Sequence, residues 1–200
     1  MKGITAPQEL ALAKLAAIVA PGTYLAGGVA VAIRFGHRQS LDLDLFVPDG
    51  DPALLTPELT APSFVVLTRQ AGTLYLEVDG VPASVLRYAY PSLRPPERIA
   101  QVPIEVASIE DLAAMKLSAI ASRGKARDFW DLQVILSARA TPLAEALDRY
   151  RQKYAAEDIG HVVRSLSYFA DAEAEPLPRG LTAAGWEEIA RDLRARVLAL

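Results

Sequence analysis

The sequence contains no cysteine and only two histidines, His37 and His161. Disulfide bonds, thiolate catalysis and cysteine-ligated zinc are therefore excluded, and a metal site built from several histidines is not expected. No apolar run approaches the ~20 residues of a membrane span. The first residues also lack the basic start, apolar stretch and cleavage site of a signal peptide. These absences predict a cytoplasmic protein with no membrane partner.

The sequence has no strong excess of charge of either sign. Its 21 Lys and Arg residues are offset by 24 Asp and Glu residues, which gives a formal net charge of -3. This balance argues against a wholly basic nucleic-acid coat, although a local basic patch remains compatible with it. Hydrophobic residues make up 52% of the 200 residues and charged residues 22%. This composition is typical of a globular chain that is long enough to bury a core without disulfides.

The hydrophobic pattern changes near residue 107. Before that point, short or alternating apolar runs predict strands, and two stretches predict helices. After it, the spacing is helical throughout, interrupted by an acidic, proline-bearing linker at 171–180. The predicted strands are 41–47, 64–67, 73–78, 81–88 and 104–106, and the predicted helices are 7–20, 29–35, 108–122, 126–138, one starting at 142, 158–169 and 183–198. Asp79-Gly80 predicts a hairpin turn, Gly36 predicts the end of helix 29–35, and Ser108 and Asp111 fit a capping box. The fold class expected is α+β: an α/β core over 1–107 whose small mixed or antiparallel sheet is flanked by helices, followed by a helical region over 108–200.

Two carboxylates follow a pair of glycines in the first part of the chain. On a strand, Asp42 and Asp44 would share one face, while Leu41, Leu43 and Leu45 would point into the core. Two neighbouring carboxylates suit a hard cation such as Mg²⁺, which commonly takes one or two carboxylates together with substrate phosphates. Gly27-Gly28 would let backbone N–H groups approach an anion at the start of the following helix. The order of glycines, helix and carboxylate strand therefore predicts a nucleoside triphosphate site with its metal on Asp42 and Asp44.

Each of these motifs taken alone also has an ordinary structural interpretation. A single Asp-x-Asp is often a solvated strand face, and a Gly-Gly pair is often only a turn. Arg38 and Ser40, which flank the strand, could bind phosphate, but an ion pair for Arg38 or a turn for Ser40 would explain them equally well. The combination in this order is more specific than either motif.

A second group of polar residues lies on the helices after residue 108. Lys116 has apolar neighbours at helical spacing, and at the helix edge it could reach a triphosphate as a mobile point charge, or it could simply extend to solvent. Arg127 and Asp131 are four residues apart and could form a surface ion pair, whereas Asp128 and Asp131 share a helix face. The residues alone leave these alternatives open.

Both groups resemble the motifs of a known family. The segment from Tyr24-Leu25-Ala26-Gly27-Gly28 to Leu41-Asp42-Leu43-Asp44 is similar to the first motif of the AbiEii/AbiGii-type nucleotidyltransferases, which belong to the polymerase-β-like superfamily. Ser108 to Leu117, followed by Arg123-Gly124 and Arg127-Asp128-Phe129-Trp130-Asp131-Leu132, resembles the family's lysine motif and its Arg-Asp-x-x-Asp-Leu motif. The likeness covers most of residues 20–137, and residues 1–19 and 138–200 add nothing specific to it.

The resemblance implies a polymerase-β-like core and a role for each matching residue. Asp42, Asp44, Lys116 and Asp128 would be catalytic, with Mg²⁺ or Mn²⁺ on the two strand aspartates. The nucleotide and its phosphates would contact Gly27, Gly28, Arg38, Ser40, Lys116, Arg123 and Arg127. Asp128 would orient Lys116 or an attacking hydroxyl, and Asp131 would instead brace Arg123 and Arg38.

One departure from the family pattern concerns a third carboxylate. Enzymes of this superfamily commonly carry one on a later strand, and here the expected position falls near Ser84. Serine is a poor substitute for a metal-binding base. Glu77 on the preceding strand would replace it if its side chain faced the same way.

The resemblance predicts transfer of a nucleoside monophosphate from a nucleoside triphosphate to an acceptor hydroxyl. It implies the toxin of a type IV toxin–antitoxin pair, with RNA such as tRNA, or a protein, as acceptor and an antitoxin as partner. A large acceptor needs a basic track, for which Arg34, Arg38, Arg123, Lys125 and Arg127 are candidates. The alternatives are a small-molecule acceptor, as in antibiotic-modifying nucleotidyltransferases, and a non-catalytic nucleotide-binding or interaction module, which the serine at position 84 favours. A purely structural helical protein would leave the paired glycines and aspartates unexplained.

Overall fold

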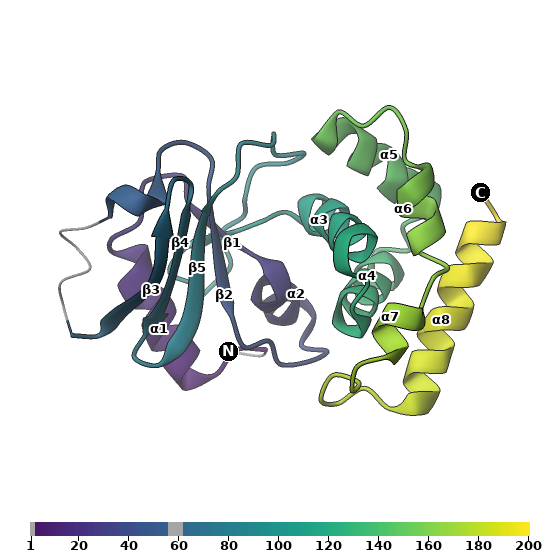
Figure 1. Cartoon of the computed structure of the whole chain (residues 1–200), viewed down its shortest axis with the longest axis horizontal. Coiled ribbons are helices and arrows are strands. Elements are labelled where there is room, and N and C mark those ends of the chain that lie inside the picture. Colours follow the sequence, from purple (N-terminus) through teal and green to yellow (C-terminus); the bar gives the residue numbers. More distant parts are fainter. Residues whose placement is uncertain (1–2, 56–61) are drawn as a thin grey trace. The chain divides into compact units, whose positions relative to one another are not determined.

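The chain divides into two compact units, which a computed structural model describes over residues 3–55 and 62–200. The first, here called the β unit, comprises Met1–Tyr90 and Pro95–Ser108. The second, the helical unit, comprises Pro91–Arg94 and Ile109–Leu200. The short segment Pro91–Arg94 thus joins the helices although it directly follows the strands. Figure 1 labels the elements of both units.

The β unit contains a mixed sheet of six strands in its described part, so the predicted α+β class is confirmed. The spatial order is β3-β4-β5-β2-β1-β6. The central pair β2–β5 is parallel, as is β1–β6, and the pairs β1–β2, β4–β5 and β3–β4 are antiparallel. The strands are β1 (Tyr24–Ala26), β2 (Leu43–Val47), β3 (Phe64–Gln70), β4 (Thr73–Val78), β5 (Val81–Arg87) and β6 (Glu105–Val106).

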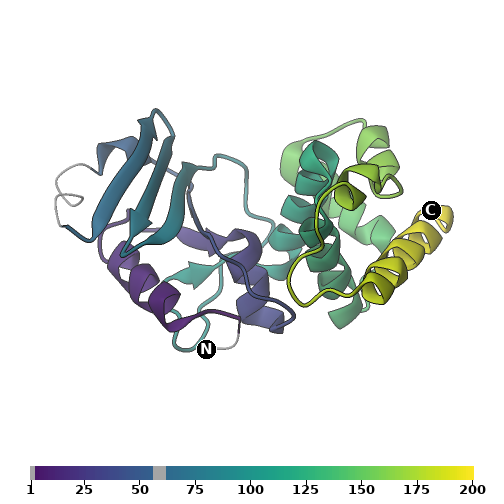
Figure 2. The ribbon, with the colours of Figure 1, turned by 60° about the horizontal axis from the view of Figure 1, so that its bottom comes forward.

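The two faces of the sheet differ in chemistry, as the register shows. Leu43 and Leu45 of β2 pair with Ala83 and Val85 of β5, and all four are buried. Helix α1 (Ala6–Ala16) contacts β4 and β5, and α2 (Gly27–Phe35) contacts β1 and β2, as Figure 2 shows from a second direction. Cross-strand partners share a face. The opposite face therefore carries the intervening residues of these strands, which include polar and aromatic side chains.

The helical unit is built around α3 (Ile109–Arg123), which contacts α4 (Ala126–Ala138), α5 (Leu143–Tyr154) and α6 (Gly160–Ser165). Helix α8 (Ala183–Leu198) packs on α4, and α7 (Ala170–Glu173) precedes it. An aromatic cluster fills this core: the Phe129 ring lies 5.2 Å from Phe169 and 5.7 Å from Trp186. No helix of the described residues has both the length and the apolarity to cross a membrane.

A buried ion pair holds Pro91–Arg94 to the helices. Lys153 of α5 places Nζ 2.6 Å from Asp111 Oδ1 and donates a hydrogen bond to the Pro91 carbonyl. The Asp111 carboxylate also accepts hydrogen bonds from the backbone N–H groups of Leu93 and Arg94. This carboxylate on the first turn of α3 is what attaches the segment to the helical unit.

The structure corrects some of the predicted elements. Strand β2 begins at Leu43 rather than at residue 41, and Leu41 is 74% exposed, so the prediction that it enters the core was wrong. The predicted helix 158–169 is the shorter α6, and α7 begins the stretch expected to be a linker. By contrast, strand 73–78 and helices 126–138 and 183–198 have the predicted bounds. Asp79 and Gly80 both have positive φ, as the predicted hairpin turn requires.

Candidate active site

Gly27 lies against the carboxylate of Asp44. It is the first residue of α2, directly after β1, and Ala26 of β1 pairs with Asp44 of β2. Its φ is +65°, and a Cβ atom placed on it would lie 2.1 Å from Asp44 Oδ2. Both the left-handed backbone and the close approach exclude a side chain at this position. The close approach to Asp44 therefore requires glycine at position 27.

Gly28 lies equally close to the side chains of Ser40 and Arg38. A Cβ atom on it would lie 2.4 Å from Ser40 Oγ and 2.6 Å from Arg38 Nη2. Arg38 is buried at 8% exposure, and it donates a hydrogen bond to the Gln39 carbonyl. The glycine pair therefore brings Asp44, Ser40 and Arg38 together at the beginning of α2.

The N-terminus of α2 has no side-chain cap. Its N-cap residue is Ala26, which offers no oxygen to the first N–H groups of the helix. Such N–H groups, together with the positive end of the helix dipole, form a favourable position for an anion. At its other end the helix terminates on Gly36 in the left-handed conformation with φ 64°, as the sequence predicted.

Gln8 holds the loop before β2, and the sequence interpretation missed it. Its Nε2 donates to the carbonyls of Ser40 at 2.7 Å and of Leu41 at 2.9 Å. Its Oε1 accepts from Thr5, which is the N-cap of α1 in a capping box. The Thr-x-x-Gln spacing is a sequence signature of that box and would have placed Gln8, although not its contact with the loop.

Ser84 lies beside Asp44 on the neighbouring strand. The two residues are register partners in the parallel pair β2–β5, and Ser84 Oγ donates to Asp44 Oδ1 at 2.8 Å. A hydroxyl therefore occupies the place next to Asp44 at which a third carboxylate was expected. Glu77 of β4 pairs with Pro82, two residues before Ser84, which puts Glu77 on the same sheet face as Ser84. It is one strand further from Asp44.

Asp42 precedes the first residue of β2, so the strand register does not fix its side-chain direction. It is exposed, and it makes no hydrogen bond or ion pair with the described residues. The carboxylates of Asp42 and Asp44 are hard oxygen donors. The donor chemistry of the two residues fits Mg²⁺ or Mn²⁺ completed by substrate phosphates. No group of three or more acidic or histidine side chains that could hold a metal is found in residues 3–55 and 62–200.

The substitution Gly27→Ala is expected to reduce nucleotidyl transfer at least about tenfold and to destabilise the β unit by about 1–3 kcal/mol, because the new methyl group must displace the Asp44 carboxylate. Thermal unfolding and a transfer assay measure the two effects. Gly80→Ala is the matched control: Gly80 has φ +77° but no atom within 4 Å of its built Cβ. Equal loss of activity in both variants would show that backbone strain alone is responsible.

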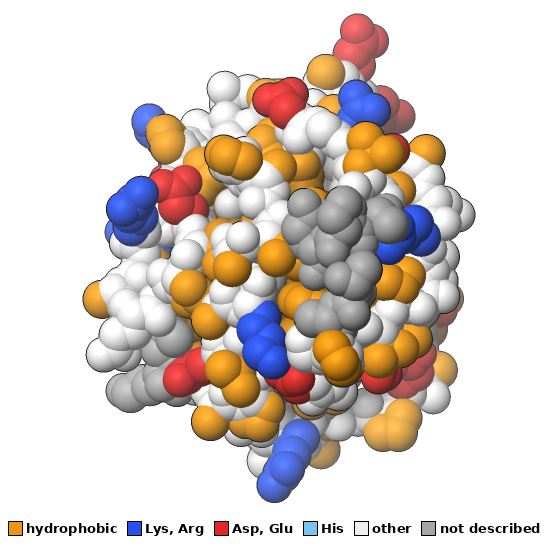
Figure 3. Space-filling view, turned by 90° about the vertical axis from the view of Figure 1, so that its left-hand side faces the viewer, with side chains coloured by type: hydrophobic (Ala, Val, Ile, Leu, Met, Phe, Trp, Pro, Cys, Tyr) orange, Lys and Arg blue, Asp and Glu red, His pale blue; other side chains and the backbone are white. Residues whose placement is uncertain are grey.

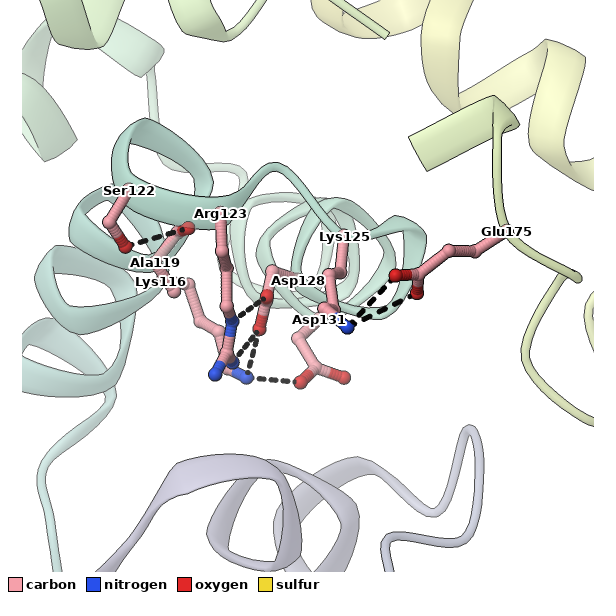
Figure 4. Close-up of polar contacts among 8 residues, drawn as sticks. All are labelled: Lys116, Ala119, Ser122, Arg123, Lys125, Asp128, Asp131 and Glu175. Atoms are coloured by element: carbon pink, nitrogen blue, oxygen red, sulfur yellow. Dashed lines mark hydrogen bonds and ion pairs between the residues drawn. The ribbon is translucent and has the colours of Figure 1, made fainter. Parts of the chain in front are cut away.

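In the helical unit, Lys116 lies between two buried aspartates rather than at a mobile helix edge. Its Nζ is 3.0 Å from Asp128 Oδ1 and 2.6 Å from Asp131 Oδ2, and Lys116 itself is 5% exposed (Figure 4). This corrects both sequence interpretations of Lys116, the mobile point charge and the surface lysine. An ammonium group has three N–H donors, and the two aspartates engage two of them.

Asp128 connects Lys116 to Arg123. Arg123 donates through Nε at 2.8 Å and Nη2 at 2.9 Å to the two oxygens of Asp128, in a bidentate pair (Figure 4). Asp131 braces Lys116. Burial on its own would raise the pKa of Asp128, but the hydrogen bonds from Arg123 and the charges of Lys116 and Arg123 outweigh it, so the pKa is lower than its ordinary value.

This lowered pKa predicts the pH dependence of stability. The unfolded chain binds a proton at Asp128 more readily than the folded chain does. The stabilisation of the fold by ionised Asp128 is therefore complete above the ordinary pKa of 3.8, and it is lost as the pH falls below that value through the lower pKa of the folded state. Asp128→Asn is expected to lower the free energy of unfolding by about 1–3 kcal/mol near neutral pH and to flatten its decline in acid.

Denaturant unfolding of both proteins between pH 7 and the acid limit of folding measures this difference. Asp148→Asn is the control, because Asp148 is exposed and makes no hydrogen bond or ion pair with the described residues. A variant whose stability declines in acid as steeply as that of the parent would contradict the assignment to Asp128.

Most cations considered for a basic track are engaged within the protein. Arg34 donates to Glu97 and to the Ala107 carbonyl, and Lys125 pairs with Glu175 at 3.0 Å (Figure 4). Arg127 is half-buried and makes no ion pair with the described residues, so the possible pair with Asp131 is not formed. The positive charges of this set therefore serve largely to hold the fold.

Comparison with known proteins identifies the family. The model of the nucleotidyl transferase AbiEii toxin family, type IV toxin–antitoxin system, matches residues 69–198. This range contains the Lys116 and Asp128 motifs and extends over residues 138–198, which we had expected to add nothing specific; the Gly27–Asp44 motif lies outside it. An uncharacterized protein of Aquifex aeolicus is 36% identical over 180 residues, covering 88% of this chain and 87% of its own.

Two solved structures have the same fold. MenT4, a nucleotidyltransferase toxin of Mycobacterium tuberculosis, has a TM-score of 0.63 at 19% identity over 96% of this chain and 82% of its own. The antibiotic-resistance factor ANT(2'')-Ia has a TM-score of 0.59 at 16% identity over 76% of this chain and 95% of its own. The α+β fold expected from the sequence, a mixed sheet flanked by helices, is thus shared with solved nucleotidyltransferases. With the family match and the fold in agreement, this chain belongs to the AbiEii family of nucleotidyltransferase toxins.

Proposed function

We propose that this protein is the toxin of a type IV toxin–antitoxin pair and transfers a nucleoside monophosphate from a nucleoside triphosphate to a hydroxyl group of RNA, for example tRNA, with a divalent metal as cofactor. The observation that carries the proposal is the contact of Gly27 with Asp44 at the uncapped start of α2. It places a carboxylate that could hold a cation beside backbone N–H groups that could receive phosphate.

The β unit would bind the triphosphate. The N–H groups at the start of α2 would hold phosphate oxygens, with Ser40 and Arg38 adjoining them through Gly28. Asp42 and Asp44 would hold Mg²⁺ or Mn²⁺, which, when bound, neutralises the charge that develops on the phosphates during transfer. The hydrogen bond from Ser84 to Asp44 would fix the direction of that carboxylate.

The helical unit would contribute positive charge held in a fixed position. The remaining N–H group of Lys116 is available to a phosphate oxygen, and Asp128 and Asp131 keep the ammonium oriented and charged. Arg123, whose side chain is 46% accessible, is a second candidate in this unit for contact with phosphate. In this assignment Asp128 is a positioning residue.

The transfer step forms one bond to phosphorus and breaks another. The acceptor hydroxyl oxygen forms a bond to the α-phosphorus, the bond from that phosphorus to the bridging oxygen breaks, and pyrophosphate leaves while the hydroxyl proton passes to a base. Ser84 cannot serve as that base, because it already donates its proton to Asp44. Glu77 is the remaining carboxylate on this sheet face among the residues predicted for the site.

Label transfer tests the proposal. The protein is incubated with Mg²⁺, each α-labelled nucleoside triphosphate in turn and total cellular RNA, with Asp42→Ala/Asp44→Ala as control. Label on RNA that is lost in the control confirms the proposal and names the base. Label on polypeptide instead would assign a protein acceptor, and label on an added antibiotic panel would assign a small molecule.

A non-catalytic module is the second candidate, since Ser84 replaces a carboxylate next to Asp44. It predicts nucleotide binding by calorimetry without transfer to any acceptor. Restoring the acid by Ser84→Asp then distinguishes a lost activity from an unsuitable acceptor.

A further inference from the structure

Tyr75 on β4 presents an aromatic ring at the surface of the sheet. It is 44% exposed, and its cross-strand partners, Thr68 on β3 and Ser84 on β5, have much smaller side chains. Its side chain makes no hydrogen bond and no ring contact with the described residues. The other tyrosines of the β unit, by contrast, lie in a chain of ring contacts that includes Phe46. A face of the Tyr75 ring is therefore available to a planar ligand.

The strand register places Tyr75 in one row with residues of the candidate site. Tyr75 pairs with Ser84, and Ser84 pairs with Asp44, so the three side chains share one face of the sheet. Neighbouring strands lie about 4.8 Å apart, so the Cα atoms of Tyr75 and Asp44 are about 10 Å apart. Glu77, two residues further along β4, lies on the same face. One nucleoside can span this distance, with its base on the ring and a ribose hydroxyl toward Asp44.

The row ends at β3, which is the outermost of the described strands on this side of the sheet (Figure 1). Thr68, which lies opposite Tyr75, and Gln70 are both exposed. Figure 3 views the protein from the side of this edge and shows apolar and charged side chains interspersed at the surface. The described residues that border Tyr75 on the side away from Asp44 are thus accessible to an acceptor longer than one nucleotide.

The sheet order decides which of the two substrates would reach Tyr75. The start of α2, where the proposed function places the phosphates, directly follows β1, and β1 lies on the other side of β2 from β5 and β4. In phosphoryl transfer the attacking and leaving oxygens lie nearly in line, on opposite sides of the phosphorus. With the leaving pyrophosphate at α2, the attacking hydroxyl approaches from the side of β5 and β4. Tyr75 therefore lies on the acceptor side of Asp44.

We propose that Tyr75 binds the acceptor by stacking on an unpaired nucleobase at the 3′ end of an RNA; this inference rests on the proposed function. Stacking on an aromatic side chain suits every nucleobase, because each base has a π face. The hydroxyl of a serine or threonine in a polypeptide is attached to no planar ring, so the available ring of Tyr75 favours RNA among the possible acceptors. Tyr75 acts in this way on the binding of the acceptor.

Binding of RNA in the absence of transfer tests the proposal. The probe is a single-stranded RNA with fluorescein at its 5′ end, and fluorescence anisotropy without nucleoside triphosphate measures its affinity. Tyr75→Leu keeps an apolar side chain but has no π face, so it is expected to weaken binding at least about fivefold, whereas Tyr75→Phe should stay within about twofold of the parent. Tyr168→Leu is the matched control, since Tyr168 is 57% exposed and belongs to the helical unit. In the transfer assay the KM for RNA should rise by the same factor, and the KM for the nucleoside triphosphate should not change.

An RNA whose 3′-terminal nucleotide lacks its base localises the contact. The loss caused by Tyr75→Leu should disappear on this RNA, because the stacking partner is already absent. An unchanged affinity of Tyr75→Leu for the intact RNA, or an equal loss on both RNAs, would overturn the proposal. A raised KM for the nucleoside triphosphate alone would assign the ring to the base of that substrate and would also overturn it. A parent protein that labels no RNA refutes the proposed function together with this inference, whereas RNA labelling with a parental KM in Tyr75→Leu refutes the inference alone.

Discussion

Replacement of Asp44 by asparagine is expected to lower the rate of nucleotidyl transfer by at least about 1,000-fold. A neutral amide binds a divalent cation much more weakly than a carboxylate does, so the metal that the proposed reaction needs would be lost. The shape of the side chain is retained, and Ser84 can still donate to its remaining oxygen. The free energy of unfolding should therefore change little. Single-turnover label transfer and denaturant unfolding measure the two quantities.

Asp49→Asn is the matched control for this experiment. Asp49 lies two residues beyond the end of β2 and is exposed, so its substitution removes the same charge from the same part of the chain. Its transfer rate should stay within about twofold of the parent. If Asp44→Asn retained the parental rate, the assignment of the metal and nucleotide to this position would be wrong.

The largest loss of stability is expected from Asp111→Ala, at about 3–5 kcal/mol. The substitution removes the carboxylate partner of the Lys153 ammonium, which is fully buried, and it deprives two backbone N–H groups of their acceptor. The segment Pro91–Arg94 should then separate from the helical unit. Urea unfolding measures the loss, and exchange at the Leu93 and Arg94 amides localises it.

A double variant separates the effect of the buried charge on stability from the effect of general damage to α3. Asp111→Ala combined with Lys153→Met should recover part of the lost stability, because the buried ammonium that has lost its carboxylate is removed as well. Asp148→Ala, which removes an exposed acid from α5, is the control and should lie within about 0.5 kcal/mol of the parent. A double variant less stable than Asp111→Ala would refute the ion pair as the source of the effect.

Local features of the sequence were sufficient to predict most helices and strands. The helices 126–138 and 183–198 and the strand 73–78 follow from apolar periodicity, and the hairpin at Asp79-Gly80 and the helix end at Gly36 follow from glycine conformation. The register position of Ser84 beside Asp44 agrees with the expected place of the missing acid. These features depend on neighbours in the chain or on one strand pairing.

Other features depended on contacts between residues far apart in the sequence. Leu41 fits the alternation of a strand, but the carbonyls of Ser40 and Leu41 bind Gln8, 32 and 33 residues earlier, and the strand starts only at Leu43. Asp111 fits a capping position, but its carboxylate binds Lys153, 42 residues later. Periodicity contains no information about such partners.

The sequence by itself determined the types and order of the candidate residues: paired glycines, two aspartates, then a lysine and an aspartate on successive helices. Only the tertiary structure decided their physical state. It placed Asp44 against Gly27, and it buried Lys116 between Asp128 and Asp131, so that a side chain expected to be mobile is fixed. The reason is that burial and charge pairing arise from helix and strand packing, which depends on the whole unit rather than on any local spacing.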